Sequence, residues 1–216
     1  MITNERIAAY IESLETELPE DLRRIEKEAL ADYVPIIKKP TRSLLRFLLH
    51  LYQPKRILEV GTAVGFSAIL MSEYMPKDCK ITTIENYPKR IEEAKKNIKA
   101  TGKENVITLL EGDAADILPM LAGENQQYDM IFMDAAKGQY PHFLPYILEM
   151  LPEGGLLISD NVLQDGDIVE SRYAVIRRNR TIHSRMRDYL YQLTHMEGMD
   201  TIVLPIGDGV TLSTKL

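Results

Sequence analysis

The sequence has a single cysteine, no tryptophan and no long uninterrupted hydrophobic run. Cys79 alone cannot form an internal disulfide and offers no thiolate cluster for a metal. Four scattered histidines, His50, His142, His183 and His195, exclude a histidine-rich metal motif. No stretch approaches the roughly 18 uncharged apolar residues of a membrane span, and the acidic, helix-like N-terminus does not resemble a signal peptide. We therefore expect a cytoplasmic protein without a membrane partner.

Charge of either sign is unevenly distributed along the chain. The net charge of −6 argues against non-specific binding of nucleic acid by the whole surface. Residues 1–32 carry nine acidic side chains against four basic ones, whereas residues 172–187 carry six arginines and no acidic side chain. A local basic patch is therefore compatible with the acidic total.

The 216 residues fit one domain with two parts. Residues 1–52 have helical apolar spacing, interrupted by Pro35 and Pro40, and predict a helical N-terminal cover. Residues 53–216 predict an α/β core, in which short apolar runs alternate with amphipathic ones. The predicted strands are residues 56–60, 80–84, 106–110, 128–133 and 156–159. The predicted helices are residues 66–74, 88–100, 114–121 and 140–150.

Such alternation predicts a doubly wound parallel sheet with helices on both faces. Two final apolar runs, residues 201–205 and 210–213, are joined by Ile206-Gly207-Asp208-Gly209. Because Asp-Gly between strand-like runs is a hairpin signal, we expect the sheet to end in an antiparallel hairpin. The segment 168–197 before the hairpin is predicted to be mostly helical.

The first predicted strand ends in a glycine-containing turn, where open α/β sheets bind ligands. The spacing of Gly61 and Gly65 differs from the G-x-G-x-x-G of dinucleotide-binding proteins. Glu85 ends the second strand and can accept hydrogen bonds from both hydroxyls of a ribose. Glu59 beside the turn suits a cationic sulfonium better than a pyrophosphate. Together they favour S-adenosylmethionine over NAD; the alternative is that the glycines only close a tight turn.

Oxygen side chains follow the fourth and fifth predicted strands. Asp134 follows one strand and Asp160 and Asn161 follow the other, so their side chains can converge. Two carboxylates and one amide suit an octahedral magnesium ion completed by water or substrate oxygens. Lys137 lies three residues after Asp134, at the opening of the predicted metal site. A bound cation there would lower the pKa of Lys137 and make it a general base. Alternatively, each aspartate only caps a helix and the lysine is solvated.

The chain resembles the cation-dependent O-methyltransferases, which include the catechol and caffeoyl-CoA enzymes. The resemblance rests on Glu85 and on four segments: ILEVGTAVGFSA, MDAAKGQY, SDNVL and LPIGDGV. The resemblance runs from about residue 34 to the C-terminus. It implies a seven-stranded, Rossmann-like class I methyltransferase fold, S-adenosylmethionine as methyl donor, Mg²⁺ or Mn²⁺, and a homodimer. Asp134, Asp160 and Asn161 would bind the metal, and Lys137 would be the catalytic base beside Asp134. The residues that would line the cofactor are Ile37, Glu59, Gly61, Ser67, Glu85, Asp113, Ala114 and Asp134.

The AAKGQY segment and the following Pro141-His142-Phe143 resemble the bacterial tRNA branch of that family. Its members methylate the hydroxyl of 5-hydroxyuridine at the wobble position, which lies beside a carbonyl oxygen and so can chelate a metal as a catechol does. Arginine suits phosphate contacts and stacking on bases, so a tRNA anticodon stem-loop is the expected partner. The candidate RNA-binding residues are Lys38, Lys39, Arg42, Arg172, Arg177, Arg178 and Arg180.

Other functions fit parts of this pattern. The basic residues could form a solvated helix face or a dimer contact. The acceptor could be a free catechol or a hydroxycinnamoyl thioester. A silent binding module would be expected to lack the metal ligands, and an NAD-dependent oxidoreductase is disfavoured by the missing dinucleotide motif.

Overall fold

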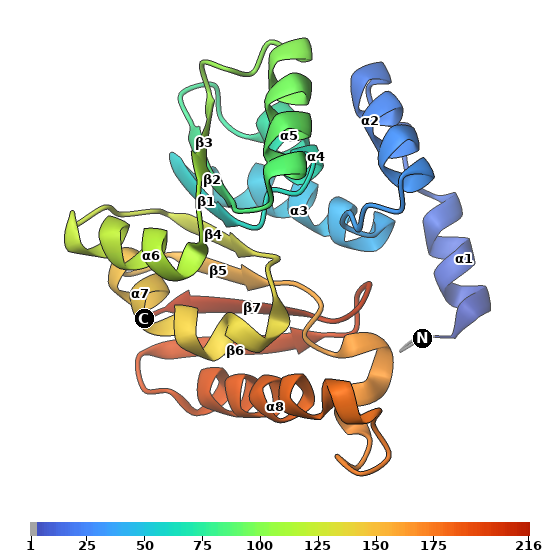
Figure 1. The fold of residues 1–216 in the computed structure, drawn as a ribbon, viewed down its shortest axis with the longest axis vertical. Helices are drawn as coiled ribbons and strands as arrows, with labels where there is room; N and C mark the ends of the chain where they lie inside the picture. Colours follow the sequence, from blue (N-terminus) through green and yellow to red (C-terminus); the bar gives the residue numbers. More distant parts are fainter. Residues whose placement is uncertain (1–3) are drawn as a thin grey trace.

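A computed structural model describes residues 4–216, which form one seven-stranded sheet between two layers of helices (Figure 1). The strand order is β3-β2-β1-β4-β5-β7-β6. Strands β1 to β5 pair in parallel, whereas β7 is antiparallel to both β5 and β6. This confirms the doubly wound sheet that ends in an antiparallel hairpin. The strands are β1 (Arg56–Val60), β2 (Lys80–Glu85), β3 (Ile107–Glu111), β4 (Met130–Met133), β5 (Leu156–Ser159), β6 (Met199–Leu204) and β7 (Val210–Lys215).

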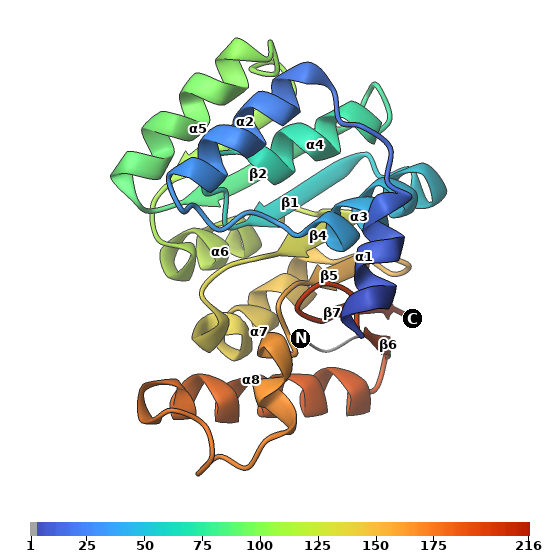
Figure 2. The same cartoon turned by 90° about the vertical axis from the view of Figure 1, so that its right-hand side faces the viewer.

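The helices divide between the two faces of the sheet. Figure 2 shows α2, α4 and α5 together on one side and α8 on the other, and the two hydrophobic clusters follow the same division. The helices of the first face are α2 (Glu20–Ala31), α3 (Lys39–Tyr52), α4 (Phe66–Tyr74) and α5 (Pro88–Ala100), preceded by the peripheral α1 (Glu5–Ser13). Those of the second face are α6 (Ala114–Gly123), α7 (Tyr140–Met150) and α8 (Arg180–His195).

The central strands are continuous apolar runs because helices cover both of their faces. In β4, Met130 and Phe132 enter the first cluster, whereas Ile131 and Met133 enter the second. This alternation is the period of two expected for a strand. All four side chains are fully buried.

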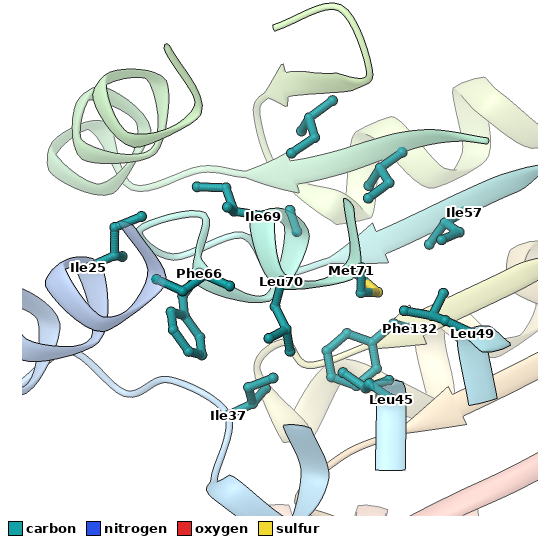
Figure 3. Close-up of a cluster of buried hydrophobic side chains, with 14 of the residues drawn as sticks. Ile25, Ile37, Leu45, Leu49, Ile57, Phe66, Ile69, Leu70, Met71 and Phe132 are labelled. Carbon is teal, nitrogen blue, oxygen red and sulfur yellow. The ribbon is translucent and has the colours of Figure 1, made fainter. Parts of the chain in front are cut away.

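The N-terminal helices share their core with the sheet. Figure 3 shows Ile25 of α2 and Leu45 of α3 in the same apolar cluster as Phe66 and Leu70 of α4. Helix α3 ends at Tyr52, the boundary expected for the cover. The cover is therefore fixed to the sheet by buried apolar contacts, and the segment between α2 and α3 lies above the strand ends.

The prediction that residues 168–197 are mostly helical is confirmed by α8, but the residues before Arg180 are not α-helical. Residues before α8 form two short 3-10 helices, η2 (Gln164–Val169) and η3 (Arg177–Asn179), joined by turns. Of residues 170–179 only Val175 is buried, so this segment has too few buried side chains to hold a helix against the sheet. No helix among residues 4–216 is long and apolar enough to cross a membrane.

Candidate active site

A cavity of about 860 Å³ opens at the carboxyl ends of the parallel strands. Its walls come from the loops after β1, β2, β3, β4 and β5, from the segment before α3, and from the β6–β7 turn. This is the edge at which doubly wound sheets bind ligands. Of the residues predicted for the cofactor and metal sites, those that line the cavity are Ile37, Gly61, Ser67, Glu85, Asp113, Ala114, Asp134, Lys137, Asp160 and Asn161.

The turn after β1 lies directly on the end of β4. Gly61 has φ +105°, and a Cβ placed there would lie 2.1 Å from the carbonyl oxygen of Asp134. The backbone N–H groups of Gly61 and Thr62 both donate to the carbonyl of Ile84, at 3.2 and 3.1 Å. Glycine is therefore required at position 61 both by conformation and by space.

Glu85 is held rigidly at the wall of the cavity. Its carboxylate accepts hydrogen bonds from the backbone N–H groups of Ala63 at 2.8 Å, Asn86 at 3.0 Å and Tyr87 at 2.9 Å. Each oxygen of a carboxylate can accept more than one hydrogen bond, so Glu85 can still accept from ligand hydroxyls. Asp113 both lines the cavity and caps α6 through the N–H of Ala115.

Glu59 does not line the cavity, contrary to its predicted position against the cofactor. The side chain is fully buried beneath the loop, where Thr83 donates a hydrogen bond to it. Burial raises the pKa of Glu59 to about 8. The folded protein therefore keeps this carboxyl group protonated at neutral pH, and Glu59 is linked to the cavity indirectly, by a hydrogen bond with Ser67 of the wall.

The buried acid predicts how stability depends on pH. Between the ordinary pKa of 4.5 and the folded value of about 8, the unfolded chain releases a proton that the folded protein retains. The free energy of unfolding therefore falls as pH rises through this window. Relative to Glu59→Gln, the wild type should lose about 3 kcal/mol between pH 5 and pH 7.5.

Urea unfolding of both proteins, without metal or cofactor, measures this difference. Glu104→Gln, at an exposed glutamate, controls for the loss of one carboxyl group. An E59Q variant whose stability parallels the wild type across the range would show that Glu59 titrates normally.

Asp134, Asp160 and Asn161 converge at the ends of β4 and β5. The backbone N–H of Asp134 donates to Val60 and that of Asp160 donates to Met133, each at 3.0 Å, which fixes both strand ends. The side-chain amide of Asn161 donates to Asp134 Oδ1 at 2.8 Å, and its backbone N–H donates to Asp160 Oδ1 at 2.7 Å. Adjacent parallel strands thus bring the three predicted metal ligands into one cluster.

The charges of this cluster fit a divalent cation. Burial raises the pKa of both Asp134 and Asp160, and the negative charge of Asp134 raises that of Asp160 further. Lys137 opposes these shifts from the mouth of the cavity. Rotation of the Asn161 amide would turn its oxygen toward the same point. Among residues 4–216 no three acidic, histidine or cysteine side chains form a metal cluster, so water or acceptor oxygens would have to complete the shell.

Contacts from Tyr140 and from Arg185 position the loop that carries Lys137. The hydroxyl of Tyr140 lies 3.0 Å from the carbonyl oxygens of both Met133 and Asp160, between the two strand ends. Arg185 of α8 donates to the carbonyl of Gly138 at 2.9 Å. The short 3-10 helix η1 (Lys137–Gln139) is therefore held from both sides.

Asp208 lines the cavity and was missed as a site residue by the sequence reasoning. It lies in the β6–β7 turn, where Asp-Gly is common for conformational reasons alone. Its carbonyl accepts from Leu163 N–H, and the carbonyl of Gly209 accepts from Val162 N–H. The hairpin turn thus supports the loop that begins at Asn161.

Two of the residues predicted to bind RNA interact with other parts of the protein instead. Arg42 is buried and paired with Glu15 and Glu26, so it is unavailable to a polyanion. Arg180 donates hydrogen bonds to the backbone carbonyls of Tyr173 and Val175.

The remaining predicted cations differ in availability. Lys38 lines the cavity and pairs with Asp208. Lys39, Arg172, Arg177 and Arg178 are exposed.

Comparisons with known proteins agree with this geometry. A profile of the O-methyltransferase family matches residues 8–216. The catechol O-methyltransferase of Niastella koreensis is 39% identical over 127 residues, which span 58% of each chain. Caffeoyl-CoA O-methyltransferase 2 of Populus trichocarpa is 29% identical over 80% of this chain and 71% of the relative. The structure of TomG, an O-methyltransferase from Streptomyces achromogenes solved with S-adenosylmethionine, is 25% identical, with a TM-score of 0.84 over 97% of this chain and 96% of that one.

The family match spans nearly the whole described chain, and the seven-stranded sheet is shared with the solved methyltransferase. The chain therefore belongs to the O-methyltransferase family, the S-adenosylmethionine-dependent O-methyltransferases of the catechol and caffeoyl-CoA type.

Proposed function

We propose that this protein methylates the 5-hydroxyl of 5-hydroxyuridine at the wobble position of tRNA, giving 5-methoxyuridine, with a divalent cation. The cluster of Asp134, Asp160 and Asn161 on the cavity wall carries the proposal. Such a donor set leaves positions for two neighbouring acceptor oxygens, and the modified base offers a hydroxyl beside a carbonyl.

The methyl donor would bind at one end of the cavity, and the cation and the acceptor would bind at the other. The Gly61 turn, Glu85 and Asp113 would hold the methyl donor, with Ile37 above it. A cation bound by the cluster would lower the pKa of the acceptor hydroxyl. Lys137 would accept the hydroxyl proton in its neutral amine form, which a neighbouring bound cation would favour. S-adenosylmethionine, when bound, would supply the methyl group, which would pass from its sulfonium sulfur to the acceptor oxygen and leave a neutral thioether.

Catalysis in this scheme depends mainly on positioning. Holding two reactants in near-attack geometry can remove several kcal/mol from a barrier. Both binding regions lie on fixed strand ends, joined through the contact of Gly61 with the backbone of Asp134.

Two observations support tRNA as the acceptor. The MDAAKGQY segment resembles the tRNA branch of the family, and Lys39, Arg172, Arg177 and Arg178 are exposed. Arg172 lies in the turn after η2, and Arg177 and Arg178 lie in η3, in the segment that follows the cation site along the chain. Exposed guanidinium groups suit phosphate contacts.

A small catechol is the second candidate acceptor. The similarity to the catechol enzyme of Niastella koreensis favours it, and the two neighbouring hydroxyls of a catechol offer the same pair of oxygens to the cation site.

A competition assay separates the two acceptors. Purified protein with Mg²⁺ and labelled S-adenosylmethionine is offered 5-hydroxyuridine-containing tRNA and a catechol together. We expect the label in tRNA, as 5-methoxyuridine identified by mass spectrometry of nucleosides. Label confined to the catechol would refute the tRNA assignment and support the second candidate.

Charge variants sharpen this test. Replacing Arg172, Arg177 and Arg178 with glutamine should weaken tRNA binding. The slope of the logarithm of the binding constant against the logarithm of salt concentration should become shallower, by the equivalent of about three phosphate contacts at most. The matched control replaces three exposed lysines elsewhere, Lys27, Lys77 and Lys99. Equal losses in both triple variants would indicate net charge, with no arginine-specific contact.

A further inference from the structure

A lysine of the cover reaches across the mouth of the cavity to the last hairpin of the sheet. Lys38 Nζ contacts Asp208 Oδ1 of the β6–β7 turn and lies 3.3 Å from Asp165 Oδ1 in η2. The partners are 170 and 127 residues away along the chain. One ammonium group thus joins three segments that close the cavity.

The segment that Lys38 holds is attached to the core by the buried side chains of Val34 and Ile37. Residues 34–38 belong to neither helix nor strand, yet Pro35, Ile36 and Ile37 line the cavity together with Lys38. The segment is anchored at its start by Val34, whose N–H donates to Ala29 at 2.8 Å, and at its end by the first turn of α3.

Asp208 is firmly placed to receive the lysine. Its side chain is only 13% exposed, against 51% for Lys38. Its backbone carbonyl accepts from Leu163 N–H at 2.9 Å, next to the cation site. A Cβ at neighbouring Gly207 would lie 2.7 Å from Thr41 Oγ1, so the turn also lies close against the start of α3.

We propose that Lys38 and Asp208 are positioning residues whose ion pair closes the cover segment over bound cofactor and must open for cofactor exchange. The proposal rests on the assignment of the cavity to S-adenosylmethionine. Because Asp208 also supports the loop after Asn161, the pair couples closure at the cofactor end to the geometry of the acceptor end.

An ion pair with one half-exposed partner adds little to global stability. Its loss should therefore change cofactor exchange much more than unfolding. Such a division distinguishes a closing contact from a residue that only stabilises the fold.

The test measures release of S-adenosylhomocysteine by stopped flow, with chelator and without acceptor. Lys38→Met and Asp208→Asn should each release it about tenfold faster than wild type, with nearly unchanged Tm. In turnover, the rise in KM for S-adenosylmethionine should exceed any fall in kcat. Lys27→Met, at an exposed lysine of α2, is the matched control and should release at the wild-type rate.

A double variant shows whether the two residues act as one pair. K38M/D208N should release product no faster than either single variant, because the second change removes nothing further. Wild-type release by K38M, or multiplied effects in the double variant, would overturn the proposal. If the wild-type protein does not bind S-adenosylhomocysteine at all, the assignment of the cavity to the cofactor is refuted. If the protein does not methylate tRNA, the release measurements still test the ion pair.

Discussion

Replacing Asp134 with asparagine should give a protein that is more stable than wild type without metal and yet transfers methyl groups at least about a hundredfold more slowly. Burial raises the pKa of Asp134, and its charge in turn raises that of Asp160. Removing one buried like charge should therefore stabilise the metal-free fold by about 1 to 2 kcal/mol at pH 7.5. Asparagine keeps an oxygen to accept the hydrogen bond from Asn161.

The same substitution removes a ligand of the cation. Mg²⁺ should raise the Tm of the wild type, because a ligand that binds only the folded state stabilises it, and it should leave the Tm of D134N nearly unchanged. Excess EDTA should reduce wild-type activity to the level of the variant. Asp188→Asn, at an exposed aspartate of α8, is the control.

These readouts can fail separately. Full activity of D134N, or of wild type in EDTA, would remove the cation from the reaction. A variant less stable than wild type without metal would mean that Asp134 is a structural hydrogen-bond acceptor whose charge costs little.

The sheet could be predicted because its information is local. Buried parallel strands are short apolar runs, and the expected residues 56–60 and 156–159 are the observed β1 and β5. The Asp-Gly signal placed the final hairpin correctly. The segment before α8 was harder, because whether its side chains are buried depends on tertiary packing that no local pattern records.

The core of the site could be predicted for a similar reason. Strand ends of a parallel sheet meet at one edge, so the topology alone brings Asp134 and Asp160 together. Contacts between segments that are distant along the chain could not be predicted from the sequence. Arg42 looked like a free cation because its partners, Glu15 and Glu26, lie on the neighbouring cover helices and loops. Asp208 looked like a turn residue because Lys38, with which it pairs, lies 170 residues away along the chain.

Glu59 shows the limit of inference from residue type. An acid at the end of β1 was expected to face the cofactor, but strand alternation turns it to the α4 side of the sheet, where water does not reach it. Its chemistry in the fold is that of a neutral hydrogen-bonding group at pH 7, since burial raises its pKa to about 8.

A single methyl group at Gly61 should cost more than about 3 kcal/mol of stability, because overpacking adds to an unfavourable backbone conformation. The new Cβ would lie 2.1 Å from the oxygen and 2.9 Å from the carbon of the Asp134 carbonyl, and a backbone cannot rotate away as a side chain can. Relief requires the β1 turn and the β4 end to separate. Gly61→Ala should therefore also lose S-adenosylhomocysteine affinity and cation-dependent stabilisation together, since this contact joins the two halves of the site.

Gly102→Ala measures the cost of the backbone conformation without any steric overlap of the new methyl group. Gly102 also has positive φ, at +67°, but a Cβ there would meet no atom within 4 Å. Its substitution should cost only about 1 kcal/mol, the cost of the left-handed conformation alone, and leave ligand binding intact. Urea unfolding and calorimetry of the two variants compare the effects directly. If G61A behaves like G102A, then the turn after β1 does not press on Asp134. In that case the cofactor and cation sites would be held together by something other than this backbone contact.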